Sequence, residues 1–540
     1  MYTQEMLASM KKVEANRAAN AALEPRRMTA DEKDALLAKY HPDYKTGEFS
    51  VLKIGPNKGE KVPHELAALL EGKSRVNPDE IDLNRIDYDV DVLIIGGGGA
   101  GSSAAIEADK AGAKVMIVTK LRIGDANTMM AEGGIQAADK PNDSPAQHFL
   151  DAYGGGHFAA KKELLYKLVT EAPEAIQWLQ DLGVEFDKTA DGTMVTTHGG
   201  GTSRKRMHAA KDYSGAEIMR TLRDEVLNRG IPVVDFTAAI EIIKDEQGKA
   251  AGAVLLNMET GELRIARAKT VVIATGGAGR LHYQGFPTSN HYGATADGLI
   301  LAYRCGAKLL YADTLQYHPT GAAYPSQIFG ALVTEKVRSL GAKLVNVNGE
   351  VFMHPLETRD VAAASIIREC SDHEAGVKTS DGIGVWLDTP MIELKGGEGT
   401  IEKRIPAMMR MFEKYGIDIR KEPILVYPTL HYQNGGIDIS PDGMSGVENL
   451  FVAGEAVGGI HGRNRLMGNS LLDVIVFGRN AGVHAAAAAE KAVVGKLTLQ
   501  HVNDFAKERE NAGIDTDVVS PKLLPVYTHG NPVFEGKKTF

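Results

Sequence analysis

The clearest hydrophobic pattern in the chain begins at residue 90. Residues 90–95 are apolar except for one aspartate, which predicts a buried strand. An alanine-rich helical pattern follows at 102–111, and a second strand is predicted at 114–119. Strand, helix and strand in this order form a βαβ unit, which is typical of an open α/β sheet.

Further strand-like runs lie at 231–236, 251–257 and 270–274, and they alternate with helical patterns to about residue 305. Another apolar strand at 450–453 precedes a helical pattern from about 470 to 492. Strands of one sheet on both sides of a long insertion predict an α/β fold with a discontinuous Rossmann-like domain. The expected divisions are an N-terminal extension (1–85), the first part of the Rossmann-like domain (86–305), an inserted α+β capping domain (306–428), the second part of the Rossmann-like domain (429–495), and a C-terminal helix with an extended tail (496–540).

The N-terminal extension is polar and contains one clear helix start. Thr29, Asp31 and Glu32 form a capping-box pattern, in which the threonine and the glutamate satisfy each other's backbone amides. We expect this extension to wrap the core or to meet a partner.

A glycine-rich turn lies between the first predicted strand and its helix. Gly96, Gly98 and Gly101 fit the GxGxxG pattern, which allows a tight turn, a close approach of backbone to a pyrophosphate, and close packing of helix on strand. In this context the pattern predicts a dinucleotide site. The second strand ends in Thr119 and Lys120 and lacks the acidic residue that NAD sites use, so FAD fits better than NAD.

Composition excludes several classes of function. The net charge of -9 and the absence of a Lys/Arg block argue against a nucleic-acid partner. Only Cys305 and Cys370 are present, so we expect no metal site and no iron–sulfur cluster held by this chain alone. No apolar run approaches the roughly 18 residues of a membrane span, and residues 1–27 contain no signal-peptide pattern. A cytoplasmic location is therefore expected.

A series of short motifs follows the glycine-rich turn in a fixed order. They are AEGGI at 131–135, ATGG at 274–277, DG at 297–298, HPTG at 318–321, TE at 334–335 followed by Arg338, RD at 359–360, HY at 431–432, and NRL at 464–466 before NSL at 469–471. In this order they resemble the flavoprotein subunit of succinate dehydrogenase and fumarate reductase, and more loosely L-aspartate oxidase, across about residues 88–490.

The resemblance implies which residues bind FAD. They are Gly96, Gly98, Gly101, Thr119, Lys120, Thr128, Gly133, Gly134, Asp297, Glu455, Ser470 and Leu471. Asp297 and Glu455 would accept hydrogen bonds from sugar or ribityl hydroxyls; the alternative role for both is capping of a helix N-terminus.

The resemblance also implies a C4 dicarboxylate substrate, fumarate or succinate. A small dianion in a poorly hydrated site needs several fixed donors and compensating positive charge. Arg465 and His431 would hold one carboxylate, and Thr334 and His318 the other.

For the proton that accompanies hydride transfer, the resemblance points to Arg359. Glu335 and Arg338 would relay protons to it if residues 334–338 are helical, because positions three apart share one face.

Two positions depart from the family's pattern. Asn127 occupies the place of the histidine that carries flavin covalently in membrane-bound relatives, so we expect non-covalent FAD and a tilt toward alkene reduction. His198, before a run of glycines, matches neither the aromatic residue of fumarate reductases nor the glutamate of L-aspartate oxidase. It could donate to a substrate carboxylate, or it could only pack locally.

The leading interpretation is the catalytic subunit of an electron-transfer complex that reduces fumarate or oxidises succinate, with the iron–sulfur clusters on a partner subunit. One alternative is an amino acid oxidase similar to L-aspartate oxidase. Another is a non-catalytic FAD-binding electron-transfer subunit, which would have no need of Thr334, Glu335, Arg359, His431 and Arg465.

Overall fold

The predicted βαβ unit lies at the centre of an eight-stranded sheet. In the computed structural model, which describes residues 2–527, β4 (Tyr88–Ile95) is followed by α4 (Gly99–Lys110) and by β5 (Val115–Val118). β4 pairs in parallel with β5 on one side and with β12 (Leu263–Ile273) on the other. The carboxyl ends of these parallel strands therefore meet at one edge of the sheet, where ligands bind in open α/β folds.

The long strand β12 pairs with two different strands along one of its sides. Its first residues pair antiparallel with β11 (Ala250–Asn257), and its last residues pair in parallel with β20 (Leu450–Val452). Residues from both ends of the predicted insertion thus complete one sheet, as the sequence indicated. The strand order is β21-β10-β11-β12-β4-β5-β9, with β20 on β12.

The prediction of a strand over residues 231–236 is wrong in its extent. Only β9 (Val233–Val234) forms there, as a short parallel partner of β5. Phe236 then has a φ of 50°, a left-handed conformation that ends the extended run. The chain turns into β10 (Thr237–Asp245), a long antiparallel strand that the sequence pattern did not reveal.

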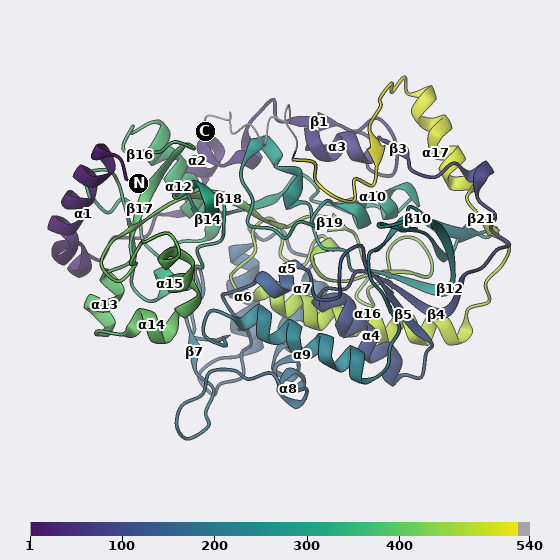
Figure 1. Ribbon diagram of the computed structural model, residues 1–540, viewed down its shortest axis with the longest axis horizontal. Coiled ribbons are helices and arrows are strands. Elements are labelled where there is room, and N and C mark those ends of the chain that lie inside the picture. Colours follow the sequence, from purple (N-terminus) through teal and green to yellow (C-terminus); the bar gives the residue numbers. More distant parts are fainter. Residues whose placement is uncertain (1, 528–540) are drawn as a thin grey trace.

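Two helices pack unusually closely against each other below the sheet. α16 (Asn469–Lys491) crosses α4, and a Cβ at Gly482 would lie 2.2 Å from the carbonyl oxygen of Ala104. Only glycine at that position permits this approach. Figure 1 shows α4, α16 and α9 (Ser214–Asn228) beneath the strands, with α16 running past α4.

A second, smaller sheet forms the other lobe, at the left of Figure 1. Its antiparallel order is β14 (Leu315–Ala322), β18 (Ile424–Gln433), β17 (Ile383–Asp388) and β15 (Lys343–Val345), and α12 (Arg359–Ser371) packs on it. The boundary expected at residue 428 falls inside β18, because this strand stays paired with β14 as far as Gln433.

The N-terminal extension runs along both lobes. α1 (Gln4–Ala22) lies on the smaller lobe, where Arg17 pairs with Asp388, and α2 (Ala30–Tyr40) packs on α12. The capping box at Thr29 and Glu32 is confirmed. Farther along, α3 (His64–Leu70) packs on α10 (Asp297–Arg304) of the larger lobe.

The C-terminal part returns to the extension. After β21 (Leu497–Thr498) and α17 (Gln500–Asn511), β22 (Val519–Ser520) pairs in parallel with β3 (Lys73–Ser74). The last residues of the expected tail, 528–540, lie outside the described residues. Among residues 2–527, no helix combines the length and the apolar character that a membrane crossing needs.

Shorter elements connect these layers. The remaining α-helices are α5 (Asn127–Met130), α6 (Pro145–Gly155), α7 (Lys162–Thr170), α8 (Ala172–Asp181), α11 (Lys336–Ser339), α13 (Met391–Gly396), α14 (Thr400–Arg404) and α15 (Pro406–Glu413). The remaining strands are β1 (Phe49–Val51), β2 (Lys61–Pro63), β6 (Ile135–Gln136), β7 (Thr196–Thr197), β8 (Met207–His208), β13 (Leu309–Leu310), β16 (Val377–Lys378) and β19 (Gly436–Ile437).

Candidate active site

The glycine-rich turn brings the N-terminus of α4 to the carboxyl edge of the large sheet. Gly96 has a φ of 120°, and a Cβ there would lie 2.2 Å from the carbonyl oxygen of Ala274. A Cβ at Gly101 would lie 1.9 Å from the carbonyl oxygen of Gly96. Gly98 is the N-cap of α4. The amide of Gly99 donates to Thr128 Oγ1 at 3.2 Å, and the next amides of the first turn, which have no partner within the helix, face the turn as a site for an anion.

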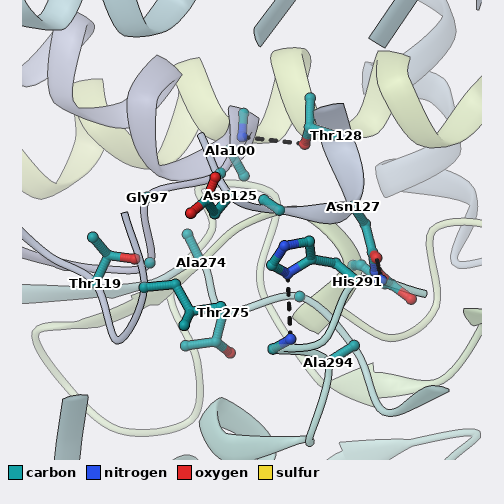
Figure 2. A pocket seen from close by; sticks show the side chains of 18 of the residues that line it. Gly97, Ala100, Thr119, Asp125, Asn127, Thr128, Ala274, Thr275, His291 and Ala294 are labelled. Carbon is teal, nitrogen blue, oxygen red and sulfur yellow. Dashed lines mark hydrogen bonds between the residues drawn. The ribbon is translucent and has the colours of Figure 1, made fainter. Parts of the chain in front are cut away.

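A cleft with about 1320 Å³ of space opens at this turn (Figure 2). Most of the predicted FAD residues line it, namely Gly96, Gly98, Thr119, Lys120, Thr128, Asp297, Glu455, Ser470 and Leu471. Gly101 packs helix against strand instead, and Gly133 and Gly134 line a neighbouring cavity.

The chemistry of the cleft fits a dinucleotide. Thr275 and Asn290 line it, and the buried Thr275 Oγ1 and Asn290 Oδ1 have no hydrogen-bond partner within the described part of the chain. Thr275 Oγ1 lies beside Gly298 and Asn290 Oδ1 beside Gly279, two glycines that do not line the cleft. The glycine-rich backbone of the turn and the amides at the start of α4 are therefore the groups that suit the phosphates of FAD.

The side chain of Asn127 is held by the protein. Its Nδ2 donates to Glu455 Oε2 at 3.1 Å, and its Oδ1 accepts from the amide of His291 at 2.6 Å. Burial raises the pKa of Glu455. His291, which the sequence analysis did not single out, lines the cleft, and its ring points into the pocket in Figure 2.

A second cavity of about 350 Å³ adjoins the cleft. Four of the predicted substrate residues line it: His318 of β14, His431 of β18, Thr334 and Arg465. Glu335 and Arg359 line it as well, the latter as the first residue of α12. The cleft and the cavity share wall residues, which are Ala131, Leu332, His431, Ser470 and Leu471.

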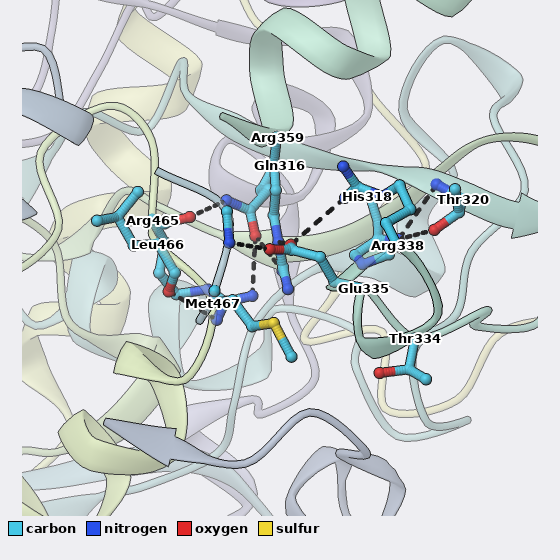
Figure 3. A network of polar contacts seen from close by, with 12 residues as sticks. Gln316, His318, Thr320, Thr334, Glu335, Arg338, Arg359, Arg465, Leu466 and Met467 are labelled. Carbon is cyan, nitrogen blue, oxygen red and sulfur yellow. Dashed lines mark hydrogen bonds and ion pairs between the residues drawn. The ribbon is translucent and has the colours of Figure 1, made fainter. Parts of the chain in front are cut away.

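Glu335 lies at the centre of the predicted relay (Figure 3). Arg359 Nε donates to its Oε2 at 2.8 Å, Arg338 Nη2 lies 3.5 Å from the same oxygen, and the amide of Gly200 donates to its Oε1. Burial alone would raise the pKa of Glu335, but the charges of Arg359 and Arg338 outweigh it and lower that pKa. The helix expected at 334–338 is only partly present: α11 begins at Lys336, with Glu335 as its N-cap in a helical conformation. Arg338 lies buried behind Glu335 rather than in the cavity wall.

Gln316 joins the two arginines of the cavity, and the sequence analysis missed it. Its Oε1 accepts from Arg359 Nη1 at 2.9 Å and from Arg465 Nη2 at 2.8 Å, and its Nε2 donates to the carbonyl of Arg465 at 2.6 Å. Gln316 lies two positions before His318 in β14. Because side chains two apart share one face of a strand, this spacing could have identified it.

Both histidines of the cavity are neutral donors. Burial, and then the charge of Arg359, place the pKa values of His318 and His431 well below the ordinary value. The amide of Thr320 donates to Nδ1 of His318 at 3.2 Å, so the proton of that ring lies on Nε2.

Arg465 completes the cavity's positive charge. Its guanidinium lies 4.4 Å from the centre of the Tyr432 ring, and its Nη1 donates to Ser470 Oγ at 2.9 Å. Burial, with the charge of Arg359, lowers the pKa of Arg465 to about 9, which leaves it a cation at neutral pH. Arg359 and Arg465 in the cavity wall, with Arg338 behind Glu335, outnumber the one carboxylate that pairs with them and give a cationic site that suits a small dianion.

The structure does not bring His198 into this site. His198 lies beyond β7, half-buried, and it lines neither the cleft nor the cavity described above. Its neighbour Gly200 reaches the site through the backbone amide. Glu132 and Met467 line the cavity although neither was singled out, and burial raises the pKa of Glu132 well above its usual value.

Comparison with known proteins gives matches over most of the chain. The family model for the FAD binding domain matches residues 91–471. One subunit of the fumarate reductase (CoM/CoB) of Methanothermobacter marburgensis is 38% identical over 433 residues, which cover 78% of this chain and 76% of the relative. L-aspartate oxidase of Streptomyces coelicolor is 35% identical, with 74% and 68% of the two chains covered. The succinate dehydrogenase flavoprotein subunit of Coxiella burnetii is 34% identical, with 74% and 70% covered.

Solved structures give the same result. The quinol fumarate reductase flavoprotein of E. coli superposes with a TM-score of 0.71 at 32% identity, covering 78% of this chain and 74% of that one. The Sdh1 complex of Mycobacterium smegmatis with UQ1 gives a TM-score of 0.66 at 37% identity, with 78% and 72% covered.

Proposed function

Because the chain belongs to the FAD-binding family that includes the flavoprotein subunits of fumarate reductase and succinate dehydrogenase, we propose that it is a catalytic subunit that moves a hydride between FAD and a C4 dicarboxylate. The observation that carries the proposal is the cationic cavity, which shares a wall with the FAD cleft. A substrate held there lies against the cofactor.

The cavity's residues divide the work of binding. Arg465 and His431 hold one carboxylate of the substrate, while Thr334 and His318 donate to the other. Both histidines are neutral and Arg465 is charged at neutral pH, so the site supplies donors without further change of protonation. Fixed donors in a buried site polarise the alkene at little reorganisation cost.

Bound flavin would supply the redox chemistry: in its reduced form it would give a hydride to one alkene carbon, and in its oxidised form it would accept one in the reverse direction. Arg359 gives the neighbouring carbon its proton, which balances the conversion of fumarate into succinate. A guanidinium is a poor acid because its pKa exceeds about 12, so after it gives up its proton Arg359 needs a neighbouring carboxylate that takes up a proton from solvent and passes it on. Glu335, 2.8 Å from Arg359 Nε, has that role, and Arg338 stabilises its charge.

The flavin is held without a covalent bond in this proposal. Asn127 offers no nucleophile, and its amide is engaged with Glu455 and His291. Acid precipitation of the holoenzyme therefore releases all FAD into the supernatant. Yellow colour that remains with the protein pellet would contradict non-covalent binding. The absence of the covalent bond favours fumarate reduction as the working direction.

Electrons reach the flavin from another subunit. Cys305 and Cys370 are both buried, and no group of His, Cys, Asp or Glu within residues 2–527 is arranged to hold a metal ion. The relatives carry the names of subunits of larger complexes, which supports a partner subunit as the electron donor; the iron–sulfur clusters of that partner are what the family resemblance implies.

An activity like that of L-aspartate oxidase has less support from the cavity. A substrate ammonium needs a free carboxylate, but Glu335 is paired with arginines, and burial raises the pKa of Glu132 well above its usual value, which disfavours its charged form. Peroxide formation with L-aspartate in air would favour that alternative.

The proposed reaction is tested by reducing the flavin anaerobically and recording its absorbance after fumarate is added. We expect rapid reoxidation in the wild type. Arg359→Ala should slow it by about 10²–10⁴-fold, the usual contribution of a general acid. The matched control is Arg463→Ala, which removes a partly exposed arginine paired with Asp313 outside the cavity. A wild type that fumarate does not reoxidise, despite bound FAD, would refute the proposal.

A further inference from the structure

Lys120 follows β5 and lines the FAD cleft, but its ammonium is fully engaged by the protein. Nζ donates to Asp297 Oδ2 at 2.5 Å, to Thr295 Oγ1 at 2.8 Å and to the carbonyl of Leu523 at 2.6 Å. A lysine ammonium has three donors and no acceptor. None therefore remains for a phosphate of the cofactor, in contrast to the direct contact that the family resemblance implied.

Asp297, at the start of α10, is engaged in the same cluster. Its Oδ1 accepts from the amide of Leu523 at 3.1 Å and from Thr295 Oγ1 at 3.0 Å, and its Oδ2 accepts from Lys120. A carboxylate offers about four acceptor positions, so one remains for a hydroxyl of the cofactor.

Leu523 belongs to residues 519–527, here called the C-terminal strap. Its first part is anchored by β22 on β3 and by buried Arg304, which donates to Ser520 Oγ at 2.7 Å. Beyond Leu523, the hydroxyl of Tyr292 donates to the carbonyl of Pro525 at 3.0 Å, and Nε2 of His282 lies 2.7 Å from the hydroxyl of Tyr527.

The backbone of Leu523 is strained where it meets the cluster. Leu523 is buried and has a φ of 69°, a left-handed conformation that is unfavourable for a non-glycine residue. Such a conformation persists only where surrounding contacts impose it. Here those contacts are the bonds to Lys120, Thr295 and Asp297.

The strap ties together two segments that border the cleft. One is the end of β5, with Thr119 and Lys120; the other is the loop from His291 to Asp297, of which Ala294 borders the pocket in Figure 2. We propose that the C-terminal strap is a latch of the FAD site, which Lys120, Thr295 and Asp297 close and whose opening limits the release of non-covalent FAD. The proposal rests on FAD binding and not on the dicarboxylate chemistry, so each can fail without the other.

The rate of FAD release tests the latch. Holoenzyme is diluted rapidly, and the rise of free-flavin fluorescence is recorded without any dicarboxylate. A chain that ends at residue 518 is compared with one that ends at residue 527, and Lys120→Met is made in both. Lys308→Met, at an exposed lysine, is the matched control. We expect each single change to speed release by at least about tenfold, since several hydrogen bonds are lost, and the control to leave it unchanged.

The double variant distinguishes a latch from a direct contact between Lys120 and the cofactor. If Lys120 acts by fastening the strap, Lys120→Met adds nothing in the chain that ends at 518. If Lys120 holds a phosphate itself, the two effects multiply, and the proposal is wrong. Equal release from the chains that end at 518 and 527 overturns it as well.

If the chain that ends at 518 does not fold, a second measurement tests the latch. It compares the full-length wild type with the full-length variants Lys120→Met and Thr295→Val. Coupling is reciprocal, so bound FAD must protect the strap from carboxypeptidase in the wild type and lose that effect in both variants. Digestion at the same rate with and without FAD in the wild type would refute the latch.

Discussion

At the scale of single residues, Gln316 fixes the positions of the two arginines of the small cavity relative to each other. Gln316→Leu removes the oxygen that Arg359 and Arg465 share and leaves two buried guanidinium groups without it. We expect kcat to fall by about 10–100-fold, because a displacement of about 1 Å at a reacting group has an effect of this size. Steady-state fumarate reduction with an artificial electron donor measures it.

Gln316→Glu is the matched control for that prediction. It keeps an acceptor for both arginines but adds a negative charge beside a dianionic substrate. KM should rise more than kcat falls. A Gln316→Leu enzyme with wild-type kcat would show that the arginines keep their positions without this residue.

Residue types within ordered motifs predicted most of the cavity from the sequence. His318, Thr334, Glu335, Arg359, His431 and Arg465 line one cavity, although they come from separate elements. Gln316 and His291 were not predicted, because neither belongs to one of the motifs. Gln316 shares a strand face with His318, and the backbone amide of His291 donates to Asn127. His198 was singled out for its unusual type, but that type says nothing about the direction of its loop.

At the scale of elements, α1 is held on the smaller lobe by several contacts, of which one is a buried ion pair. Arg17 Nε lies 2.9 Å from Asp388 Oδ1, and the Asp388 side chain is fully buried. Burial raises the pKa of Asp388 to about 6. A carboxyl with a raised pKa binds its proton more tightly in the folded state, so folded-state stability falls as the pH rises from about 4 toward 6.

Arg17→Met should therefore destabilise the protein in a pH-dependent way. At pH 8 the variant leaves an ionised, buried carboxylate without its cation, which costs about 1–3 kcal/mol. At pH 5 Asp388 is largely protonated, so the penalty should shrink. Melting temperatures of the wild type and the variant at both pH values measure this, with Arg17→Met combined with Asp388→Asn as the control. A penalty equal at pH 5 and pH 8 would contradict the role of this pair.

The local sequence pattern predicted some helices and strands correctly and missed others. The βαβ unit and the α2 capping box follow from apolar runs and from side-chain–backbone bonds only three residues apart, and both are confirmed. β10 was missed because its strand begins after the left-handed Phe236, a turn that apolar periodicity does not reveal. β18 crosses an expected boundary because its length is set by pairing with β14, more than a hundred residues earlier.

At the scale of the whole molecule, the contacts between distant segments could not be predicted from the sequence. The extension reaches both lobes, and Leu523 meets Lys120 across about four hundred residues. Nothing in the composition of either segment identifies the other, since the group that Lys120 contacts is a backbone carbonyl, which every residue has. The family resemblance of the motifs predicted which residues serve FAD and substrate, while the three-dimensional structure shows that the cleft and the cavity lined by most of them share a wall.

That shared wall predicts thermodynamic coupling between the two ligands. Ala131, Leu332, His431, Ser470 and Leu471 border both the cleft and the cavity, so bound FAD forms part of the surface against which a dicarboxylate packs. Succinate should therefore raise the melting temperature of the holoenzyme much more than that of the apoenzyme, because a ligand stabilises only the state that binds it. Differential scanning calorimetry of both forms measures the two shifts, with acetate as the monocarboxylate control. Reciprocity then requires succinate to strengthen FAD binding by the same factor. Equal succinate shifts in apoenzyme and holoenzyme would mean that the cavity binds dicarboxylate without help from the cofactor, and the proposed packing of substrate on flavin would have to be abandoned.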